Sequence, residues 1–381
     1  MSPLSYPPRA SGFSLVEIMV GLVIGLLGVL VIMQVATISQ EQQRTTTSGD
    51  NAQNNGAIAL YGLQSDIRQA GYGVSTLNLI GCGVTLRAGV TLNAIAPVTI
   101  NPSWIPAAAS DANTDTVLVV YGNSNGAAEG VGITSGSGTI YPVATPTAFN
   151  LNDQVIAEPQ TRPASCALII DTVAGVNPPA SPVTVTTGTT TILPNGNATD
   201  MTNGMLYNLG QQTATQWPVF HVYAIRNGKL TMCDYWVNDC GSAANAPINT
   251  ANEAVWVPIA SDIASLRAQY GRDTSGPPMD AIVDLFDQTT PTTNCGWVRI
   301  SAVRLAVVAR SGQYSKNNVT MAAPSWMGNT VVTGSTTGAN NPTSLPIDLS
   351  SDSNWQHYRY KVFETVIPLR NVTWMGVQSG C

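Results

Sequence analysis

The stretch GFSLVEIMVGLVIGLLGVLVIM, residues 12–33, decides the fold of this chain. A run of about twenty apolar residues is long enough to cross a bilayer as a helix. Glu17 is the only charged residue from position 13 to position 33, and a carboxylate in hydrocarbon is costly unless it has a partner. The simpler alternative is a signal anchor whose acid is incidental. Gly21 and Gly25 form a GxxxG pair, which indicates either close helix–helix contact or ordinary membrane-helix glycine.

The segment before this run, residues 1–12, is short and carries one charge, Arg9. A secretory signal peptide has its cleavage site after the apolar region, whereas here the small residue Gly12 stands before it. A cut after Gly12 would leave the apolar helix on the mature protein. The new amino terminus would be Phe13, and Glu17 would be the fifth residue.

Composition indicates an exported, β-rich chain. Charged residues make up 10% of the 381 residues, with 34 Gly and 24 Pro, which is typical of an extracytoplasmic domain with long loops. Some three hundred residues follow the apolar helix, enough for one large domain or two small ones. The net charge of −6 argues against a nucleic-acid partner.

The six cysteines favour disulfides, because an even count in an exported domain is typical of a disulfide framework. They are Cys82, Cys166, Cys233, Cys240, Cys295 and Cys381. Cys233 and Cys240 enclose a short loop and are the best candidate pair, while the remaining pairing is open. A zinc site is the rival interpretation, but His221 and His357 do not supply a matching spacing. We expect no metal and no cofactor.

Apolar residues return at helical spacing beyond the membrane, at Leu60, Leu63, Ile67 and Ala70. This periodicity predicts a helix, interrupted or continuous, from Phe13 to about Ala70. Its first half would lie in lipid and its second half on a sheet.

Strands are predicted for most of the rest of the chain. Asn227-Gly228 indicates a hairpin between residues 219–225 and 230–236, because this dipeptide suits a type I′ turn. The other predicted strands are 116–121, 166–171, 298–309 and 358–369, and 263–270 fits helix or strand. Bulky residues on both faces of 358–369 predict a central strand or an interface. The regions 122–150, 175–204 and 322–346 are predicted loops.

Several motifs could carry chemistry but have simpler explanations. Residues 122–126 fit G-x-S-x-G, yet no helical pattern follows Ser124, as a nucleophile elbow requires. The acidic residues Asp273, Asp280, Asp284 and Asp287 lack the spacing of a calcium loop, and we expect solvated loop carboxylates. The residues Trp104, Trp326 and Trp355 are either a contact surface or partly buried anchors.

Residues Gly12, Phe13, Leu15, Val16 and Glu17 resemble the type IV prepilin signature. The resemblance implies that a prepilin peptidase cleaves after Gly12 and methylates Phe13. It also implies that Glu17 is the assembly carboxylate, which meets the terminal amine of an adjoining pilin. Leaders of this class usually carry more basic residues than Arg9 alone. Major pilins tend to have a proline where this chain has Gln34, which favours a minor pilin or a pseudopilin.

Later motifs resemble the PilW class of minor pilins in their order along the chain. They are DIRQAG (66–71), SLRAQYGRD (265–273), AVRLAVVARS (302–311) and YRYKVFETVIPLRN (358–371). The resemblance implies an α+β, pilin-like fold, with a long amino-terminal helix on a mainly antiparallel β domain with long loops. The expected parts are a leader, 1–12, a transmembrane assembly helix, 13–38, its periplasmic half, 39–72, and a globular domain, 73–381.

The function implied by this resemblance is a non-enzymatic minor pilin that helps initiate type IV pilus assembly. Its partners would be other minor pilins, the major pilin, the prepilin peptidase and a tip adhesin. The protein would lie in the inner membrane with its globular domain in the periplasm, and later in the pilus, at its tip. The alternatives are a J-type minor pseudopilin of type II secretion and a membrane-anchored serine hydrolase that uses Ser124.

Overall fold

The computed structural model describes residues 12, 14–87, 89–105, 111, 113–135, 140–176, 183–186, 201–211, 218–242, 254–328 and 343–381. The chain divides into two compact units, Met1–Asn51 and Ala52–Cys381. Helix α1, Leu15–Gln69, is continuous and contributes residues to both units. The polar stretch around Gly49 does not interrupt it.

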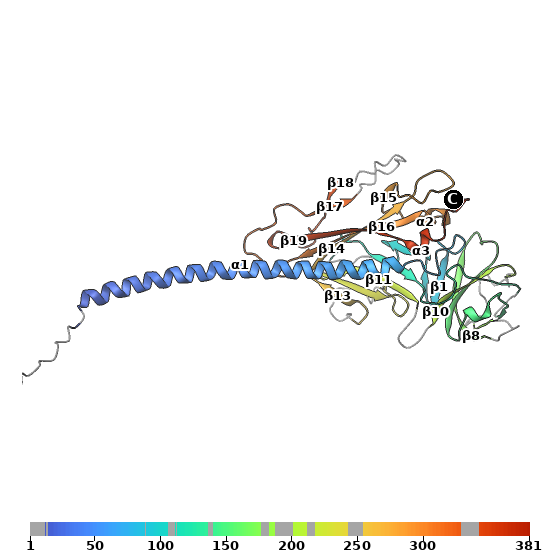
Figure 1. The fold of residues 1–381 in the computed structure, drawn as a ribbon, viewed down its shortest axis with the longest axis horizontal. Coiled ribbons are helices and arrows are strands. Elements are labelled where there is room, and N and C mark those ends of the chain that lie inside the picture. The colour runs from blue at the N-terminus through green and yellow to red at the C-terminus, as the bar shows by residue number, and fades with distance from the viewer. Residues whose placement is uncertain are drawn as a thin grey trace, which may run out of the picture. The chain divides into compact units, whose positions relative to one another are not determined.

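The described strands of the larger unit form four sheets (Figure 1). The first sheet runs β2 (Val90–Leu92), β1 (Gly83–Arg87), β8 (Ala167–Val176), β7 (Asp153–Glu158), β10 (Met205–Gln211) and β5 (Val131–Gly132), with β9 (Val183–Thr186) beside β8 and β6 (Ile140–Tyr141) beside β9. The second runs β13 (Val257–Ser261), β12 (Lys229–Asp234), β11 (Val219–Arg226), β4 (Val117–Tyr121) and β3 (Val98–Ile100). The third runs β15 (Leu285–Asp287), β14 (Ile263–Arg272), β16 (Ile300–Arg310) and β19 (Tyr360–Pro368), and β17 (Ser325–Gly328) pairs with β18 (Thr343–Pro346). The short helical turns with described bounds are η2 (Pro146–Ala148), α2 (Asn294–Val298), η4 (Trp355–His357) and α3 (Arg370–Thr373).

The predicted α+β class is confirmed, with an apolar amino-terminal helix and mainly antiparallel sheets. Among the strand pairs described, only β1 and β8 run parallel. The predicted hairpin is confirmed as β11 and β12. Asn227 and Gly228 have φ values of 52° and 68°, which a type I′ turn requires at both central positions.

The structure decides one ambiguous element and differs from two predicted ones. The ambiguous segment 263–270 is strand β14. Val298 ends helix α2 instead of beginning a strand, because Thr293 caps that helix by accepting a hydrogen bond from the Gly296 N–H. Among the described strands, β19 lies at the edge of its sheet and pairs with β16, so the prediction of a central position was wrong.

The predicted loops contain short strands. Strands β5 and β6 lie in 122–150, the end of β8 and β9 lie in 175–204, and β17 and β18 lie in 322–346. Pieces of two to four residues between turn residues are too short to show an alternating pattern. Strands β7 and β10 were missed as well, although both lie inside the first sheet, between β8 and β5.

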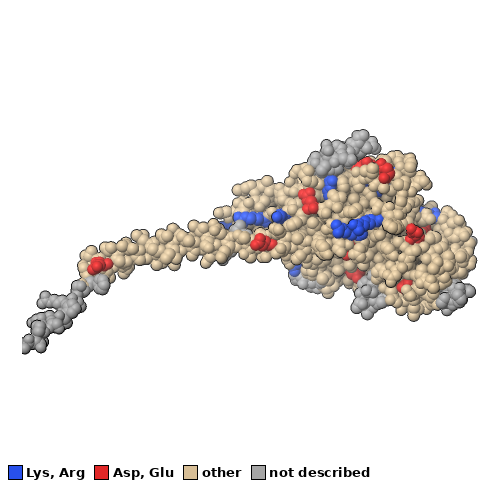
Figure 2. Space-filling model, in the orientation of Figure 1, with Lys and Arg blue, Asp and Glu red and all other residues tan. Residues whose placement is uncertain are grey.

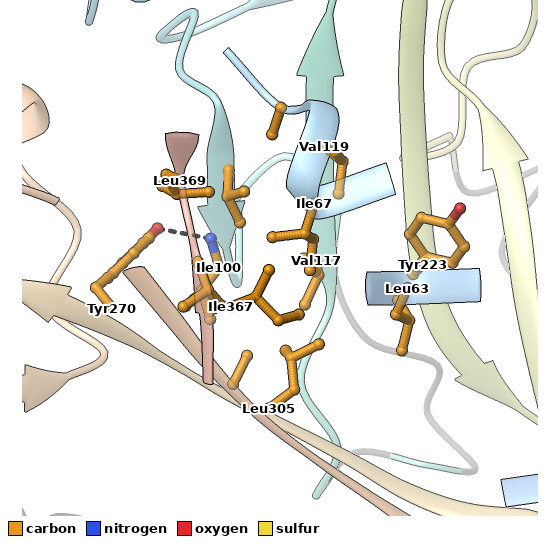
Figure 3. Packing of buried hydrophobic residues seen from close by; sticks show 14 of the residues in the cluster. Leu63, Ile67, Ile100, Val117, Val119, Tyr223, Tyr270, Leu305, Ile367 and Leu369 are labelled. Carbon is orange, nitrogen blue, oxygen red and sulfur yellow. Dashed lines mark hydrogen bonds between the residues drawn. The ribbon is translucent and has the colours of Figure 1, made fainter. Parts of the chain in front are cut away.

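The second part of α1 packs into the largest described hydrophobic cluster of the globular unit. Leu63 and Ile67 are fully buried and lie among side chains of two sheets, as Figure 3 shows. In Figure 1 strands β14 and β19 lie on one side of this part of the helix and β11 and β13 on the other. Burial of a leucine or isoleucine contributes about 1.5–3 kcal/mol, so these side chains hold the helix between the sheets.

The tryptophans Trp104, Trp326 and Trp355 are partly or fully buried anchors and not a contact surface. Trp326 is 3% exposed, and it packs with the cluster around Ala306 and Val308. Trp355 is partly buried against the same cluster. Trp104 is partly buried against a second cluster, which includes Ile105 and Phe220.

Candidate functional site

The apolar part of α1, Leu15–Gln40, has a mean hydropathy of 2.8 over its most apolar window, none of which is buried within the protein. Its large side chains are exposed all round, for example Leu22 at 67% and Ile24 at 64%. At about 1.5 Å per residue, 26 residues span about 39 Å, which exceeds the roughly 30 Å hydrocarbon core of a bilayer. This segment is therefore suited by length and composition to lie in a membrane or among other apolar helices.

Glu17 lies in the first turn of this helix. The carbonyl oxygen of Ser14 accepts hydrogen bonds from the N–H groups of Glu17, at 3.0 Å, and Ile18, at 3.1 Å. Ser14 therefore stands at the N-cap and Glu17 at the third helical position, which is the spacing of a capping box. A carboxylate is also favoured at a helix amino terminus. The S-x-x-E pattern at residues 14–17 therefore gives Glu17 a favourable place in the first turn in addition to any external partner.

The predicted processing site lies at the border of the described structure. Gly12 is described and exposed, whereas residues 1–11 and Phe13 lie outside the described residues. Cleavage after Gly12 and methylation of Phe13 stay predictions.

The carboxylate of Asp66 joins α1 to the second sheet within the globular unit. Its Oδ2 lies 2.6 Å from Nδ1 of His221 and accepts a 2.6 Å hydrogen bond from the Tyr223 hydroxyl. Its Oδ1 accepts a 3.1 Å hydrogen bond from the Tyr121 hydroxyl. Burial alone would raise the pKa of Asp66, but the hydrogen bonds from His221 and Tyr223 outweigh it and hold the pKa below 3.8.

The residues that follow Asp66 fix the end of the helix. Gly71 has a φ of 89°, a conformation that favours glycine after a helix. Its N–H donates to the Val120 carbonyl at 2.8 Å. The amide of Asn371 donates to the carbonyls of Gln69, at 2.9 Å, and Ala70, at 3.1 Å. The DIRQAG and YRYKVFETVIPLRN motifs therefore meet at the end of α1.

Charged residues at the end of the SLRAQYGRD motif form ion pairs. Arg272 pairs with Asp287 at 2.7 Å, and Arg299 pairs with Asp273 at 3.3 Å. Asp273 also accepts hydrogen bonds from the N–H groups of Asp280, at 2.8 Å, and Ala281, at 2.7 Å. The prediction of solvated carboxylates was therefore wrong for Asp273 and Asp287, which are 2% and 5% exposed. No group of three metal-ligating acidic, histidine or cysteine residues occurs in the described parts of the chain.

All six cysteines form disulfides: Cys82 with Cys166, Cys233 with Cys240, and Cys295 with Cys381. The bond between Cys233 and Cys240 is the pair that their spacing suggested. The bond to Cys295 ties the last residue of the sequence to α2, which restrains an end that would otherwise fray.

The geometry does not form a nucleophile site around Ser124. The segment after β4 continues as irregular chain to β5 and not as a helix. The Ser124 hydroxyl has no hydrogen-bond partner among the described residues. His221 is held by Asp66, and Nδ1 of His357 lies 2.8 Å from the Ser315 carbonyl. Both histidines therefore have structural roles, as their sequence positions suggested.

Charged groups are sparse on the surface. Figure 2 shows lysine, arginine and acidic residues scattered over the visible face, with uncharged surface between them. Association through this face would therefore rest on polar and apolar contacts more than on long-range electrostatic attraction.

Comparison with known proteins gives one match in the globular unit and one at the amino-terminal helix. Residues 222–371 match the family model of type IV pilus-assembly protein W, and residues 7–33 match the prokaryotic N-terminal methylation motif. No curated protein and no solved structure matches the chain. The first match contains β14, β16, β19 and Asn371, and the second contains Gly12 and Glu17. Residues 222–371 therefore resemble the PilW family of pilus-assembly proteins, and residues 7–33 carry the prepilin-type methylation signature, which together relate the chain to the type IV pilus.

Proposed function

We propose that this protein is a minor pilin that helps initiate type IV pilus assembly in a membrane complex with other minor pilins. A prepilin peptidase removes residues 1–12 and methylates Phe13. The helix from residue 13 to about residue 38 then holds the protein in the inner membrane, with the globular domain in the periplasm. Assembly carries the complex to the pilus tip, where the major pilin and a tip adhesin are further partners.

The observation that carries this proposal is an uncovered apolar helix with one acid in its first turn. A carboxylate in the hydrocarbon part of a membrane is stabilised when it pairs with the terminal ammonium of a neighbouring chain. Pairing at one fixed position also sets the axial register between subunits. Gly21 and Gly25 have open space where a side chain would lie, so another helix can approach closely on their side.

The match to a pilus-assembly family favours the pilus over the type II secretion machine. Deletion of the gene distinguishes the two machines. We expect loss of surface pili with secretion of enzymes unchanged, and the opposite phenotype would support the pseudopilin alternative.

The role of Glu17 is tested with two substitutions. Glu17→Ala removes the charge and the capping group, whereas Glu17→Gln removes the charge but keeps a side chain that can complete a capping box. We expect both variants to lose surface pili and co-purification with other pilins, at normal protein abundance. Gln34→Ala, a polar change in the same helix, is the matched control and should assemble normally.

Two results would contradict the proposal. Normal piliation by Glu17→Gln would mean that the side chain acts as a helix cap and not as an ion-pair partner. A mature protein that begins at a residue other than methylated Phe13, as measured by intact mass spectrometry, would remove the free amine that Glu17 is proposed to meet.

A further inference from the structure

A polar cleft of about 200 Å³ lies in the globular unit, remote in sequence from the apolar helix. Three segments line it: the loop after β4, the segment around η2 that leads into β7, and strand β10. The loop is the G-x-S-x-G segment at 122–126, which the proposed function does not use. The cleft is therefore formed by ordered segments, and one of them carries the G-x-S-x-G motif, to which the proposed function assigns no role.

The floor of the cleft is fixed by a buried carboxylate and amide. Asp153 is 2% exposed, and its Oδ2 accepts hydrogen bonds from the Asn150 N–H at 2.8 Å and from the Asn208 amide at 2.7 Å. The Asn208 amide also donates to the Ala148 carbonyl at 2.8 Å. These bonds join strand β10 to the segment that leads from η2 into β7, so the floor is held from two sides.

The loop that forms the opposite wall is held at both of its glycines. The Tyr72 hydroxyl donates to the Gly126 carbonyl at 2.7 Å, and the Gly122 N–H donates to the Tyr72 carbonyl at 2.8 Å. On β10, Gly210 has a φ of 106°, and a side chain there would overlap Asn123. Glycine at position 210 therefore lets the strand approach the loop closely enough to form the cleft.

One polar group of this loop has no hydrogen-bond partner among the described residues. It is the hydroxyl oxygen of Ser124, which is buried, and Ser124 lines the cleft. A buried hydroxyl without a partner is uncommon, because its desolvation is then uncompensated. The exposed side chain of Asn125 stands beside it.

The chemistry of the lining selects one class of ligand. Its side chains are amides, hydroxyls and the single carboxylate of Asp153, and no Lys, Arg, His or aromatic residue lines the described cleft. An anion would meet a carboxylate and no cation, and an apolar ligand would leave the amides unpaired. Amides and hydroxyls both donate and accept, which matches a ligand that carries several hydroxyl groups.

We propose that this cleft binds a single neutral sugar ring, a hexose or an N-acetylhexosamine. The volume is below the range of about 300–1,000 Å³ that is typical for larger ligands, so it suits one ring. The Ser124 hydroxyl and the Asn125 amide bind sugar hydroxyls, while Asp153 and Asn208 shape the floor. A calcium ion is a weaker fit, because it needs six to eight oxygen ligands and the Asp153 Oδ2 already accepts two hydrogen bonds.

Saturation-transfer NMR on the full-length protein in detergent micelles tests the proposal. The probes are free hexoses and methyl glycosides of mannose, galactose and N-acetylglucosamine. We expect saturable binding of at least one, with Ser124→Ala and Asn125→Ala each weakening it about tenfold, since each removes one hydrogen bond. Asn317→Ala, an exposed change outside the cleft, is the matched control and should bind normally. Thermal unfolding of each variant confirms that the fold is kept.

The two probe sets identify the source of the sugar. Equal binding of free sugar and methyl glycoside indicates the end of a glycan chain, whereas binding of the free sugar alone indicates a free monosaccharide. The proposal is wrong if no probe saturates, or if Ser124→Ala and Asn125→Ala bind like the unchanged protein. It is also wrong if calcium chloride alone perturbs the cleft and blocks every sugar.

Discussion

Nδ1 of His221 lies 2.6 Å from Oδ2 of Asp66, and this contact joins α1 to strand β11. The same oxygen accepts a hydrogen bond from Tyr223, so this one oxygen binds two side chains of the sheet, and Oδ1 binds a third, Tyr121. We expect Asp66→Asn to lower the free energy of unfolding by about 1.5–3 kcal/mol, because hydrogen bonds to a charged group are lost. Urea denaturation of the two proteins measures the difference. Glu129→Gln, an exposed acid-to-amide change, should stay within about 0.5 kcal/mol.

The pH dependence of this effect has a definite sign. The pKa of Asp66 is lowered from 3.8 in the folded protein, so the charged form contributes stability above pH 3.8. That contribution is lost as the pH falls through the lower folded-state pKa. The stability difference between the unchanged protein and Asp66→Asn should therefore hold steady at neutral pH and shrink in acid. A difference that grows in acid would contradict the assignment.

Glu158 should show the opposite behaviour. It is 1% exposed and accepts a 2.9 Å hydrogen bond from the Tyr207 hydroxyl, and burial raises its pKa from 4.5 to about 7. The folded state therefore holds the proton more tightly, and stability falls as the pH rises from 4.5 to about 7. Glu158→Gln keeps an acceptor for Tyr207 but does not ionise. We expect its stability relative to the unchanged protein to rise over this interval, by at most about 3 kcal/mol, and to level off above it.

Unfolding measurements at a series of pH values, with Glu129→Gln as the control, check this expectation. Parallel pH profiles for the unchanged protein and Glu158→Gln would show that Glu158 does not titrate in this range.

The parts of the fold predictable from sequence are those with a long or specific local pattern. The apolar run from residue 13, the spacing of Leu63 and Ile67, and the Asn227-Gly228 turn each impose their conformation over a few residues. The position of β19 at a sheet edge is not local. One face of β19 packs against the helix and the other against the β17–β18 hairpin, where Glu364 accepts a hydrogen bond from the Met327 N–H. Both faces are therefore covered, and an edge strand can carry bulky side chains on both.

The functional residues were predictable only where they belong to a local sequence pattern. Gly12 and Glu17 belong to one short motif, whereas the partners of Asp66 lie far along the chain at Tyr121 and His221. The alternation of His221 and Tyr223 on one strand placed both on one face, but no pattern connected that face to a helix so distant in sequence.

The disulfides should differ in their effect on stability, because they close loops of different length. Cys82 and Cys166 are 84 residues apart, and Cys233 and Cys240 are seven apart. In the chain-entropy account the longer loop contributes about 4.6 kcal/mol and the shorter about 2.4 kcal/mol. Replacing Cys82 and Cys166 with alanine should therefore cost about 2 kcal/mol more than replacing the other pair. Chemical denaturation of the two double variants measures this, and equal losses would show that local packing outweighs loop closure.

Gly56 and Gly62 of α1 should respond in opposite directions to alanine. Alanine in a helix interior is favoured over glycine by about 0.5–1 kcal/mol, and a side chain at Gly62 meets open space, so Gly62→Ala should raise the free energy of unfolding. A side chain at Gly56 would overlap the ring of Phe363 on β19. Overpacking of this kind costs about 1–3 kcal/mol, so Gly56→Ala should lower it. In a Phe363→Leu background the cost of Gly56→Ala should largely disappear, and an undiminished cost would mean that the helix and β19 are not in contact at this position.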